Sequence, residues 1–119
     1  MESHPYEVIF FETSTGRCQT NDFLDSLQLK VKAKVEKWIE KLEEHGPHLP
    51  RPYADVVSGK IRELRIKFGS NQYRLLYFFY GKTVVITHGF VKKTDAVPAN
   101  EITLAERYMN EFLNEQKGA

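Results

Sequence analysis

The sequence predicts an α+β domain in which helices pack on a mainly antiparallel sheet. Two segments repeat apolar residues at helical spacing, which is typical of helices with one buried face. Three consecutive apolar segments are joined by short turns, and short turns join antiparallel strands. The predicted order of elements is β-α-α-β-β-β-α. With 119 residues, the chain has the length of a single domain that covers residues 1–119.

The first half is predicted to contain one strand and two helices. Residues 6–11 read Tyr-Glu-Val-Ile-Phe-Phe, a composition that favours a strand, and the polar residues 13–17 end it. Thr20-Asn21-Asp22 offers N-cap side chains for a short helix. A longer helix is predicted over residues 29–44, and Gly46-Pro47 ends it. We interpret Trp38 as an anchor of the core and the lysines of this helix as a solvated face, with nucleic-acid contact as the alternative.

The second half is predicted to contain three strands and a final helix. Residues 48–59 hold Pro50 and Pro52 and are interpreted as an irregular connection. Strands are predicted over residues 61–68, 72–80 and 83–91, with turns at Gly69-Ser70-Asn71 and Gly81-Lys82. A helix is predicted over residues 100–116, with Asn100 as its cap.

Composition and motifs narrow the kinds of site that we expect. The lone Cys18 cannot form an internal disulfide, no apolar run is long enough to span a bilayer, and the first residues do not resemble a signal peptide. We therefore expect a cytoplasmic protein without a membrane association. His45 and His48 lack the further ligands of a zinc site, and phosphate-binding, dinucleotide-binding and nucleophile motifs are absent, so no metal or cofactor is expected.

Charge is distributed unevenly along the chain, although the net charge is only +1. The segment from Lys60 to Lys93 contains eight basic residues and one acid, Glu63, whereas the rest holds nine basic and fifteen acidic residues. Such a segment indicates a local anion site, for which RNA phosphate is a prime candidate. The alternative is that exposed lysines on strands only maintain solubility. Charge alone leaves both interpretations open.

Arg65, Arg74, Lys92 and Lys93 are the candidates for chemistry within this segment. Arginine binds phosphate through two parallel hydrogen bonds, and lysine adds positive charge. Such groups can stabilise the transition state in which the 2′-hydroxyl of RNA attacks the adjacent phosphate, a reaction that needs no protein nucleophile or metal. Arg74 has an alternative, because a guanidinium in an apolar strand can form an internal salt bridge with Glu63 or with an acid of a helix. Strand alternation leaves open whether Arg65 and Arg74 share a face.

Three motifs carry a resemblance to a known family. They are Glu63-Leu64-Arg65, Tyr73-Arg74, and His88-Gly89-Phe90-Val91-Lys92-Lys93, in this order. Together they resemble the phage-derived HigB-like branch of the RelE/ParE superfamily, the toxins of type II toxin–antitoxin pairs. The resemblance extends over nearly the whole chain and implies a RelE-like fold. It also implies a ribosome-dependent endonuclease that cleaves mRNA, and an antitoxin partner with a helix-turn-helix domain.

The resemblance also implies functions for individual residues. Arg65 and Arg74 would bind the scissile phosphate, and Lys92 or Lys93 would stabilise the leaving oxygen or help to move a proton. We expect the neighbouring basic and aromatic residues to contact RNA, with core packing as the alternative for the aromatic ones. These residues are Lys60, Arg62, Lys67, Tyr73, His88 and Phe90.

Two departures and two alternative functions accompany the resemblance. RelE has a catalytic tyrosine near its C-terminus, where this chain is predicted to have a helix, and Asp95 places a negative charge beside the basic segment. A ParE-like toxin would share the fold but bind DNA gyrase. An inactive phage-derived relative would only bind a partner protein.

Overall fold

The computed structural model describes residues 4–93 and 96–118 of the chain. Its elements confirm the predicted α+β class and add a strand to the predicted order. In chain order they are β1 (Glu7–Phe10), α1 (Gln19–Asp25), α2 (Leu29–His45), the 3₁₀ helix η1 (Gly46–His48), β2 (Ala54–Ser58), β3 (Ile61–Phe68), β4 (Asn71–Tyr80), β5 (Thr83–Lys92) and α3 (Ala99–Lys117).

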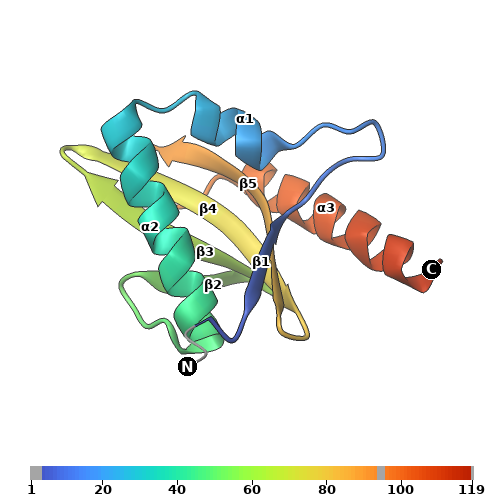
Figure 1. Ribbon diagram of the computed structural model, residues 1–119. Coiled ribbons are helices and arrows are strands. Elements are labelled where there is room, and N and C mark those ends of the chain that lie inside the picture. Colours follow the sequence, from blue (N-terminus) through green and yellow to red (C-terminus); the bar gives the residue numbers. More distant parts are fainter. Residues whose placement is uncertain (1–3, 94–95, 119) are drawn as a thin grey trace.

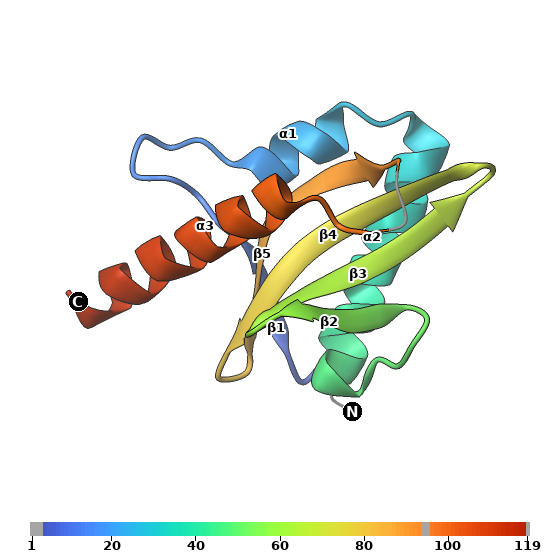
Figure 2. The ribbon, with the colours of Figure 1, turned by 180° about the vertical axis from the view of Figure 1, so that it is seen from behind.

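The strands form one mixed sheet between two helical layers. The strand order is β1-β5-β4-β3-β2, in which β1 runs parallel to β5 and the other neighbours are antiparallel. Helices α1 and α2 cross one face of the sheet (Figure 1). Seen from behind, α3 crosses the other face (Figure 2). We call these faces the α2 side and the α3 side. None of the helices, over the residues that the structure describes, has the length and apolar character needed to cross a membrane.

The α2 side is closed by apolar packing. The buried residues of α2 recur every three or four positions, so they form one stripe that faces the sheet. They are Val31, Val35, Ile39 and Leu42. Residue 89 of β5 is a glycine because α1 approaches the strand closely. A Cβ atom at Gly89 would lie 2.6 Å from Leu75 Cδ2 and 2.7 Å from Phe23 Cε2, so any side chain here would force Phe23 or Leu75 to shift.

The α3 side is covered over only part of its length. Ala105, Tyr108 and Phe112 of α3 form a second apolar cluster with residues of the sheet that include Leu76 and Phe78. Their spacing of three and four residues places them on one side of the helix. Toward the turn that joins β3 and β4, the sheet extends beyond α3 (Figure 2).

A β-bulge in β5 determines which side chains face α3. Tyr77 pairs with Ile86 and Leu76 pairs with His88, so Thr87 is the additional residue. Because of this extra residue, the alternation of faces changes phase along β5. Ile86 belongs to the α2-side core, whereas His88 lies on the same side as Leu76, facing α3.

The structure corrects the predicted boundaries in two respects. Residues 48–59 are not wholly irregular, because residues 54–58 form the edge strand β2 and pair with β3. The predicted caps are also wrong. Helix α1 begins after Cys18 and α3 after Pro98, and neither N-cap residue forms a side-chain capping bond. The end of α2 at Gly46 is confirmed, and Gly46 has a positive φ of 54°.

Candidate anion-binding face

The register of the sheet places Arg65 and Arg74 on the same face. Arg65 of β3 lies directly opposite Arg74 of β4, which lies opposite Phe90 of β5. Directly opposed residues of antiparallel strands project to the same side, so this row faces the α3 side. Lys67, Gln72 and Lys92 form the next row toward the β3–β4 turn. We call the six residues of these two rows the basic face.

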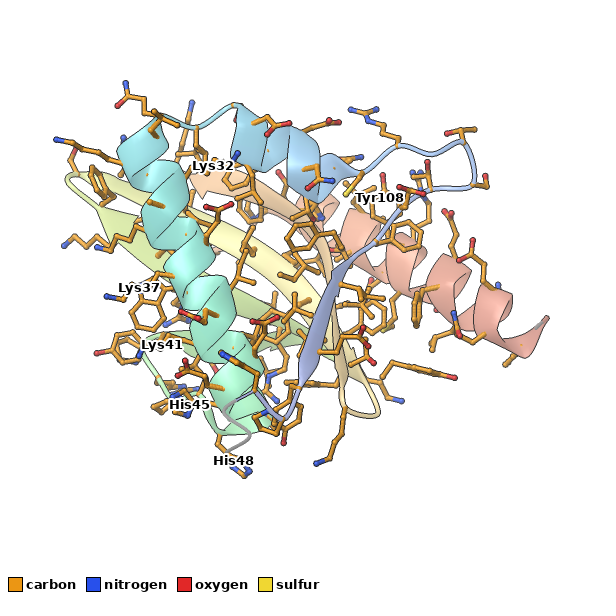
Figure 3. The ribbon with its side chains drawn as sticks, in the orientation of Figure 1. Lys32, Lys37, Lys41, His45, His48 and Tyr108 are labelled. Atoms are coloured by element: carbon orange, nitrogen blue, oxygen red, sulfur yellow. The ribbon has the colours of Figure 1, made fainter. Side chains whose placement is uncertain are left out.

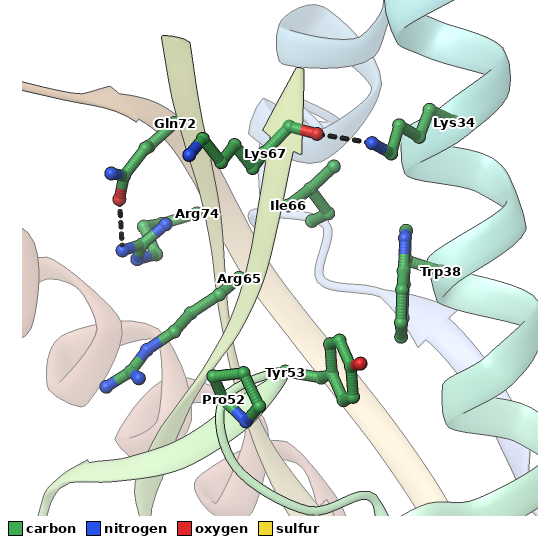
Figure 4. Close-up of a pocket in the computed structure, with 9 residues that line it drawn as sticks. All are labelled: Lys34, Trp38, Pro52, Tyr53, Arg65, Ile66, Lys67, Gln72 and Arg74. Atoms are coloured by element: carbon green, nitrogen blue, oxygen red, sulfur yellow. Dashed lines mark hydrogen bonds between the residues drawn. The ribbon is translucent and has the colours of Figure 1, made fainter. Parts of the chain in front are cut away.

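The basic face lies where α3 leaves the sheet uncovered. Figure 4 shows the side chains of Arg65 and Arg74 extending from the sheet on the side away from Trp38 of α2. Lys67 and Gln72 are exposed, and Phe90 and Lys92 are partly exposed. A ligand can therefore approach this end of the sheet without displacing a helix.

One buried carboxylate joins the two arginines. Glu63 is 4% exposed and lies one row from them, on the same face. Its Oε1 accepts a hydrogen bond from Arg74 Nε at 2.8 Å, and its Oε2 accepts from Arg65 Nη2 at 2.9 Å and Arg65 Nε at 3.2 Å. This arrangement fixes both guanidinium groups, because each is held by a carboxylate that has little freedom to move.

A second carboxylate holds Arg65 from the edge strand. Asp55 Oδ2 lies 3.4 Å from Arg65 Nη2 and 3.0 Å from Arg51 Nε. The pKa of Asp55 is lowered, chiefly because its side chain accepts a hydrogen bond from the Val56 backbone N–H, with Arg51 and Arg65 as further causes. Asp55 was not a sequence candidate because its strand was not predicted. Its pairing opposite Glu63 is what brings it to the site.

Arg74 is almost completely enclosed, with a side chain only 5% exposed. Burial lowers its pKa and the charge of Glu63 opposes that effect, yet a guanidinium remains protonated in proteins. It also donates to Gln72 Oε1 at 2.8 Å and to the Tyr73 carbonyl at 3.2 Å. The internal salt bridge with Glu63 that the sequence allowed is confirmed. Arg65, with a side chain 31% exposed, is the more accessible of the two arginines.

Lys67 adds positive charge to the basic face beyond the two arginines. Asp55 and Glu63 lie against the guanidinium groups, whereas Lys67 is exposed in the row beyond them, opposite Gln72, and Lys92 lies in the same row. Lys93 is exposed and follows the last residue of β5. Thr94 and Asp95, which follow in the sequence, lie outside the described residues.

The structure separates several other predicted RNA contacts from this face. Lys60 is exposed in the turn before β3, at the strand end opposite to Lys67. Arg62 lies opposite Tyr77 and stacks over the Phe79 ring at 5.6 Å, and Tyr73 is buried in the α2-side core. Of these predicted RNA contacts, the structure thus places Lys67 beside Arg65 and Phe90 beside Arg74.

His88 lies on the α3 side but is only 2% exposed. Its Nε2 is 2.9 Å from Glu101 Oε1 of α3, and its Nδ1 is 3.0 Å from Thr87 Oγ1. Burial lowers the pKa of His88, and Glu101 partly offsets this effect. A neutral ring that donates from Nε2 to Glu101 accepts at Nδ1 from the Thr87 hydroxyl, whose single proton is then not donated to the Leu76 carbonyl 3.2 Å away. His88 therefore joins β5 to α3 in this structure.

The lysines of α2 lie on the other side of the sheet. Lys32, Lys37 and Lys41 are distributed along this helix (Figure 3). Lys32 lies 3.4 Å from Asp25 and Lys41 lies 4.0 Å from Glu44, which are exposed ion pairs of small energetic effect. The one group of described residues whose ligand atoms could meet at a metal ion is His4, Glu40 and Glu44, on the same side. Exposed acidic groups of this kind are common without a metal.

Beside the basic face is a pocket that the sequence did not predict. Its lining includes Trp38 of α2, Tyr53 from the segment before β2, and Arg65 and Arg74. Trp38 and Tyr53 stack with ring centroids 4.7 Å apart and an interplanar angle of 24°. The two residues come from separate segments, so no local pattern indicates the pair.

The arrangement can bind and orient an anion. Arg65 is held in place by carboxylates but keeps part of its guanidinium accessible, and the exposed Lys67 adds positive charge beside it. Fixed donors of this kind stabilise charge that develops on a reacting phosphate, and they require no reorganisation during the reaction.

A match to a known protein family is consistent with the family resemblance that the motifs of the basic face carry. No curated protein matches the chain. Residues 22–110, about three quarters of the chain, match the family described as phage-derived protein Gp49-like (DUF891), and the matched region includes every residue of the basic face. Members of this family resemble RelE/HigB-like toxins in general, which suggests a toxin with an antitoxin partner. The chain belongs to the phage-derived Gp49-like family.

Proposed function

We propose that this chain is the toxin of a toxin–antitoxin pair and that it cleaves mRNA on the ribosome. The observation that supports the proposal best is the basic face, where two cross-strand arginines and two lysines lie on a part of the sheet that none of the described helices covers. Such a face suits a reaction in which the substrate supplies its own nucleophile.

In the proposed mechanism, the 2′-hydroxyl of the RNA attacks the adjacent phosphate. A bond forms between that oxygen and phosphorus, and the bond to the 5′-oxygen of the next nucleotide breaks. Arg65 donates to the non-bridging oxygens, which gain negative charge in the transition state. Arg74, which is almost completely enclosed, holds Glu63 and Gln72 in place and so fixes the carboxylate that orients Arg65.

Lysines of the face would assist the leaving group. Lys92 lies in the row beside Phe90, and Lys93 follows it at the end of β5. One of them stabilises the departing 5′-oxygen or supplies its proton. Phe90, which is partly exposed, provides an apolar surface for a base next to the cleavage site.

Arg65→Ala tests the site directly. The purified variant should lose mRNA cleavage in a translation extract and fail to arrest growth, because the accessible guanidinium is gone. Arg107→Ala is the matched control, since Arg107 is an exposed arginine of α3 whose side chain is 66% exposed. Both variants should melt within a few degrees of the wild type. Cleavage by Arg65→Ala at the wild-type rate would refute the site.

Ribosomes and gyrase distinguish the proposed activity from its alternatives. The proposal requires cleavage with ribosomes present and none on naked mRNA. Gyrase-linked DNA breaks without loss of mRNA would indicate a ParE-like toxin instead. A neighbouring reading frame for a small helix-turn-helix protein, whose product forms a complex with this chain, would identify the antitoxin.

A further inference from the structure

The pocket beside the basic face combines an apolar wall with a cationic rim. Trp38, Pro52, Tyr53 and Ile66 form the apolar wall, and the pocket has a volume of about 410 Å³. A volume of this size is typical of sites that hold a small organic molecule or one unit of a larger ligand. Figure 4 shows Tyr53 and Trp38 on one side of the β3 edge and the two arginines on the other.

The pocket exists because β2 is shorter than β3. Strand β2 begins at Ala54, which pairs with Leu64, so the following residues of β3 have no neighbouring strand on that side. The last bond across this edge runs from the Arg65 backbone N–H to the Tyr53 carbonyl at 2.8 Å. Beyond it, Lys34 of α2 donates to the carbonyl of Lys67. The missing strand leaves a hollow between the edge of β3 and the segment that carries Tyr53.

Tyr53 is held in place while part of its ring remains accessible. Its ring stacks on Trp38, which packs against the α2-side core, and 42% of the residue is exposed. An aromatic ring fixed on one face and open elsewhere is a preorganised surface for stacking.

All charged residues among those lining the pocket are basic. They are Lys34, Arg65, Lys67 and Arg74. Gln72 adds an amide whose oxygen already accepts from Arg74, so its NH₂ group can donate to a ligand. An aromatic wall with a cationic rim suits a ligand that is flat and anionic, which is the chemistry of a nucleotide.

We infer that this pocket binds one unpaired nucleobase of the RNA whose phosphate lies on the basic face. The inference rests on the proposed function and adds a subsite to it. Arg65 and Arg74 belong both to the pocket lining and to the basic face, so a phosphate held by the accessible Arg65 has its neighbouring nucleotide within reach of Tyr53. The base stacks on the accessible part of the Tyr53 ring. An apolar peptide side chain would use the wall but not the cationic rim.

Trp38 provides a direct measurement of occupancy because it is the only tryptophan in the sequence. The probe is a short single-stranded RNA with 2′-O-methyl groups, which cannot undergo attack by its own 2′-oxygen. Its titration should quench Trp38 fluorescence to saturation. An otherwise identical strand with an abasic nucleotide at each position in turn should bind less tightly at one position.

Tyr53→Leu tests the stacking surface. Leucine keeps apolar volume but removes the ring, so the affinity for the probe should fall roughly tenfold or more. Tyr53→Phe should bind like the wild type, which excludes a folding defect as the cause. Tyr80→Leu is the matched control, because Tyr80 is a tyrosine with 43% exposure at the far end of β4, and it should leave binding unchanged.

The outcomes separate the subsite from the nuclease activity. Saturable quenching that Tyr53→Leu weakens supports the subsite even if mRNA cleavage is never observed. Equal affinities for Tyr53→Leu and Tyr80→Leu would overturn the subsite, even if the wild type cleaves mRNA. Quenching by an antitoxin peptide without quenching by RNA would also overturn it and assign the pocket to a protein interface.

Discussion

The two faces of the sheet differ in how completely they are covered. On the α2 side, helices α1 and α2 bury an apolar surface along the length of the central strands. On the α3 side, one helix buries an apolar surface at one end, and charged residues occupy the other. Alternation along β3 shows the contrast directly, because Leu64 and Ile66 face one way and Glu63, Arg65 and Lys67 the other. The closed face provides the core, which leaves the open end of the other face available for binding.

The sharpest test of this contrast is removal of the carboxylate that the arginines share. Glu63→Gln leaves two guanidinium groups without their buried counter-charge, one of them 4% exposed. We expect the free energy of unfolding to fall by about 3–5 kcal/mol. Chemical denaturation measures it, with Glu111→Gln, an exposed partner of Arg107, as a control that should cost less than about 1 kcal/mol.

A double variant sharpens this first test. Glu63→Leu combined with Arg74→Met replaces the pair by apolar groups and should be less destabilised than either single variant. A double variant that loses the sum of the single effects would show that the charges are not coupled.

The closed face should be sensitive to added volume. Gly89→Ala places a methyl group where Phe23 and Leu75 already lie, and we expect a loss of about 1–3 kcal/mol. Gly118→Ala is the control, since the nearest atom to its new methyl group would be 3.7 Å away. Differential scanning calorimetry compares the two. A Gly89→Ala variant as stable as the wild type would mean that α1 moves away from the sheet at little cost.

The contact between His88 of β5 and Glu101 of α3 should make the stability of the protein depend on pH. Because the pKa of His88 is lowered in the folded state, the unfolded chain binds a proton more readily as the pH falls below the ordinary histidine value of 6.5. The contribution of the neutral ring to stability is therefore complete above this pH and is lost as the pH falls through the folded-state pKa. His88→Gln should reduce the decline in unfolding free energy between neutral and acidic pH.

Nuclear magnetic resonance of the imidazole gives an independent check on His88. Because its pKa is lowered, the neutral form of the ring should predominate at pH 6.5. Titration of His88 above that value would contradict the direction of the shift and indicate that Glu101 dominates over burial.

The smallest expected effect concerns the lysines of the basic face. Lys67→Ala should weaken binding of single-stranded RNA modestly and reduce the slope of log affinity against log salt by about 0.7, the value for one phosphate contact. Lys82→Ala, in the turn between β4 and β5, is the control and should leave the slope unchanged. Equal slopes for the two variants would remove Lys67 from the proposed RNA path.

Much of the fold could be predicted because its signals are local. The periodicity of α2 and the glycine after it set a helix that ends at His45, and the strand predicted over residues 61–68 is β3. Strand β2 was missed because a short edge strand depends on the strand that it pairs with, and prolines precede it. The caps were missed because Thr20 and Asn100 have suitable side chains but lie inside the helices.

The candidate site was predictable in its residue types but not in its geometry. The motifs selected Arg65, Arg74 and Lys92, and the pairing of Arg74 with Glu63 was one of the stated alternatives. These side chains share a face because of the register of β3, β4 and β5 and because of the bulge in β5. The residue types alone do not specify either feature. The pocket depends on a tertiary contact between Trp38 and Tyr53, for which the sequence contains no local signal.

The bulge at Thr87 has a consequence for how this surface can be gained or lost. Ile86 and His88 lie two positions apart yet face opposite sides, because the bulge takes up the residue between them. Deletion of Thr87 would place His88 directly after Ile86, so regular alternation would keep His88, Phe90 and Lys92 on the α3 side. Retention of Thr87 without the bulge would instead turn these three side chains toward the opposite helical layer. The binding surface is thus encoded by the register of β5 against β4, and it should tolerate the loss of the one residue that lies outside the pairing.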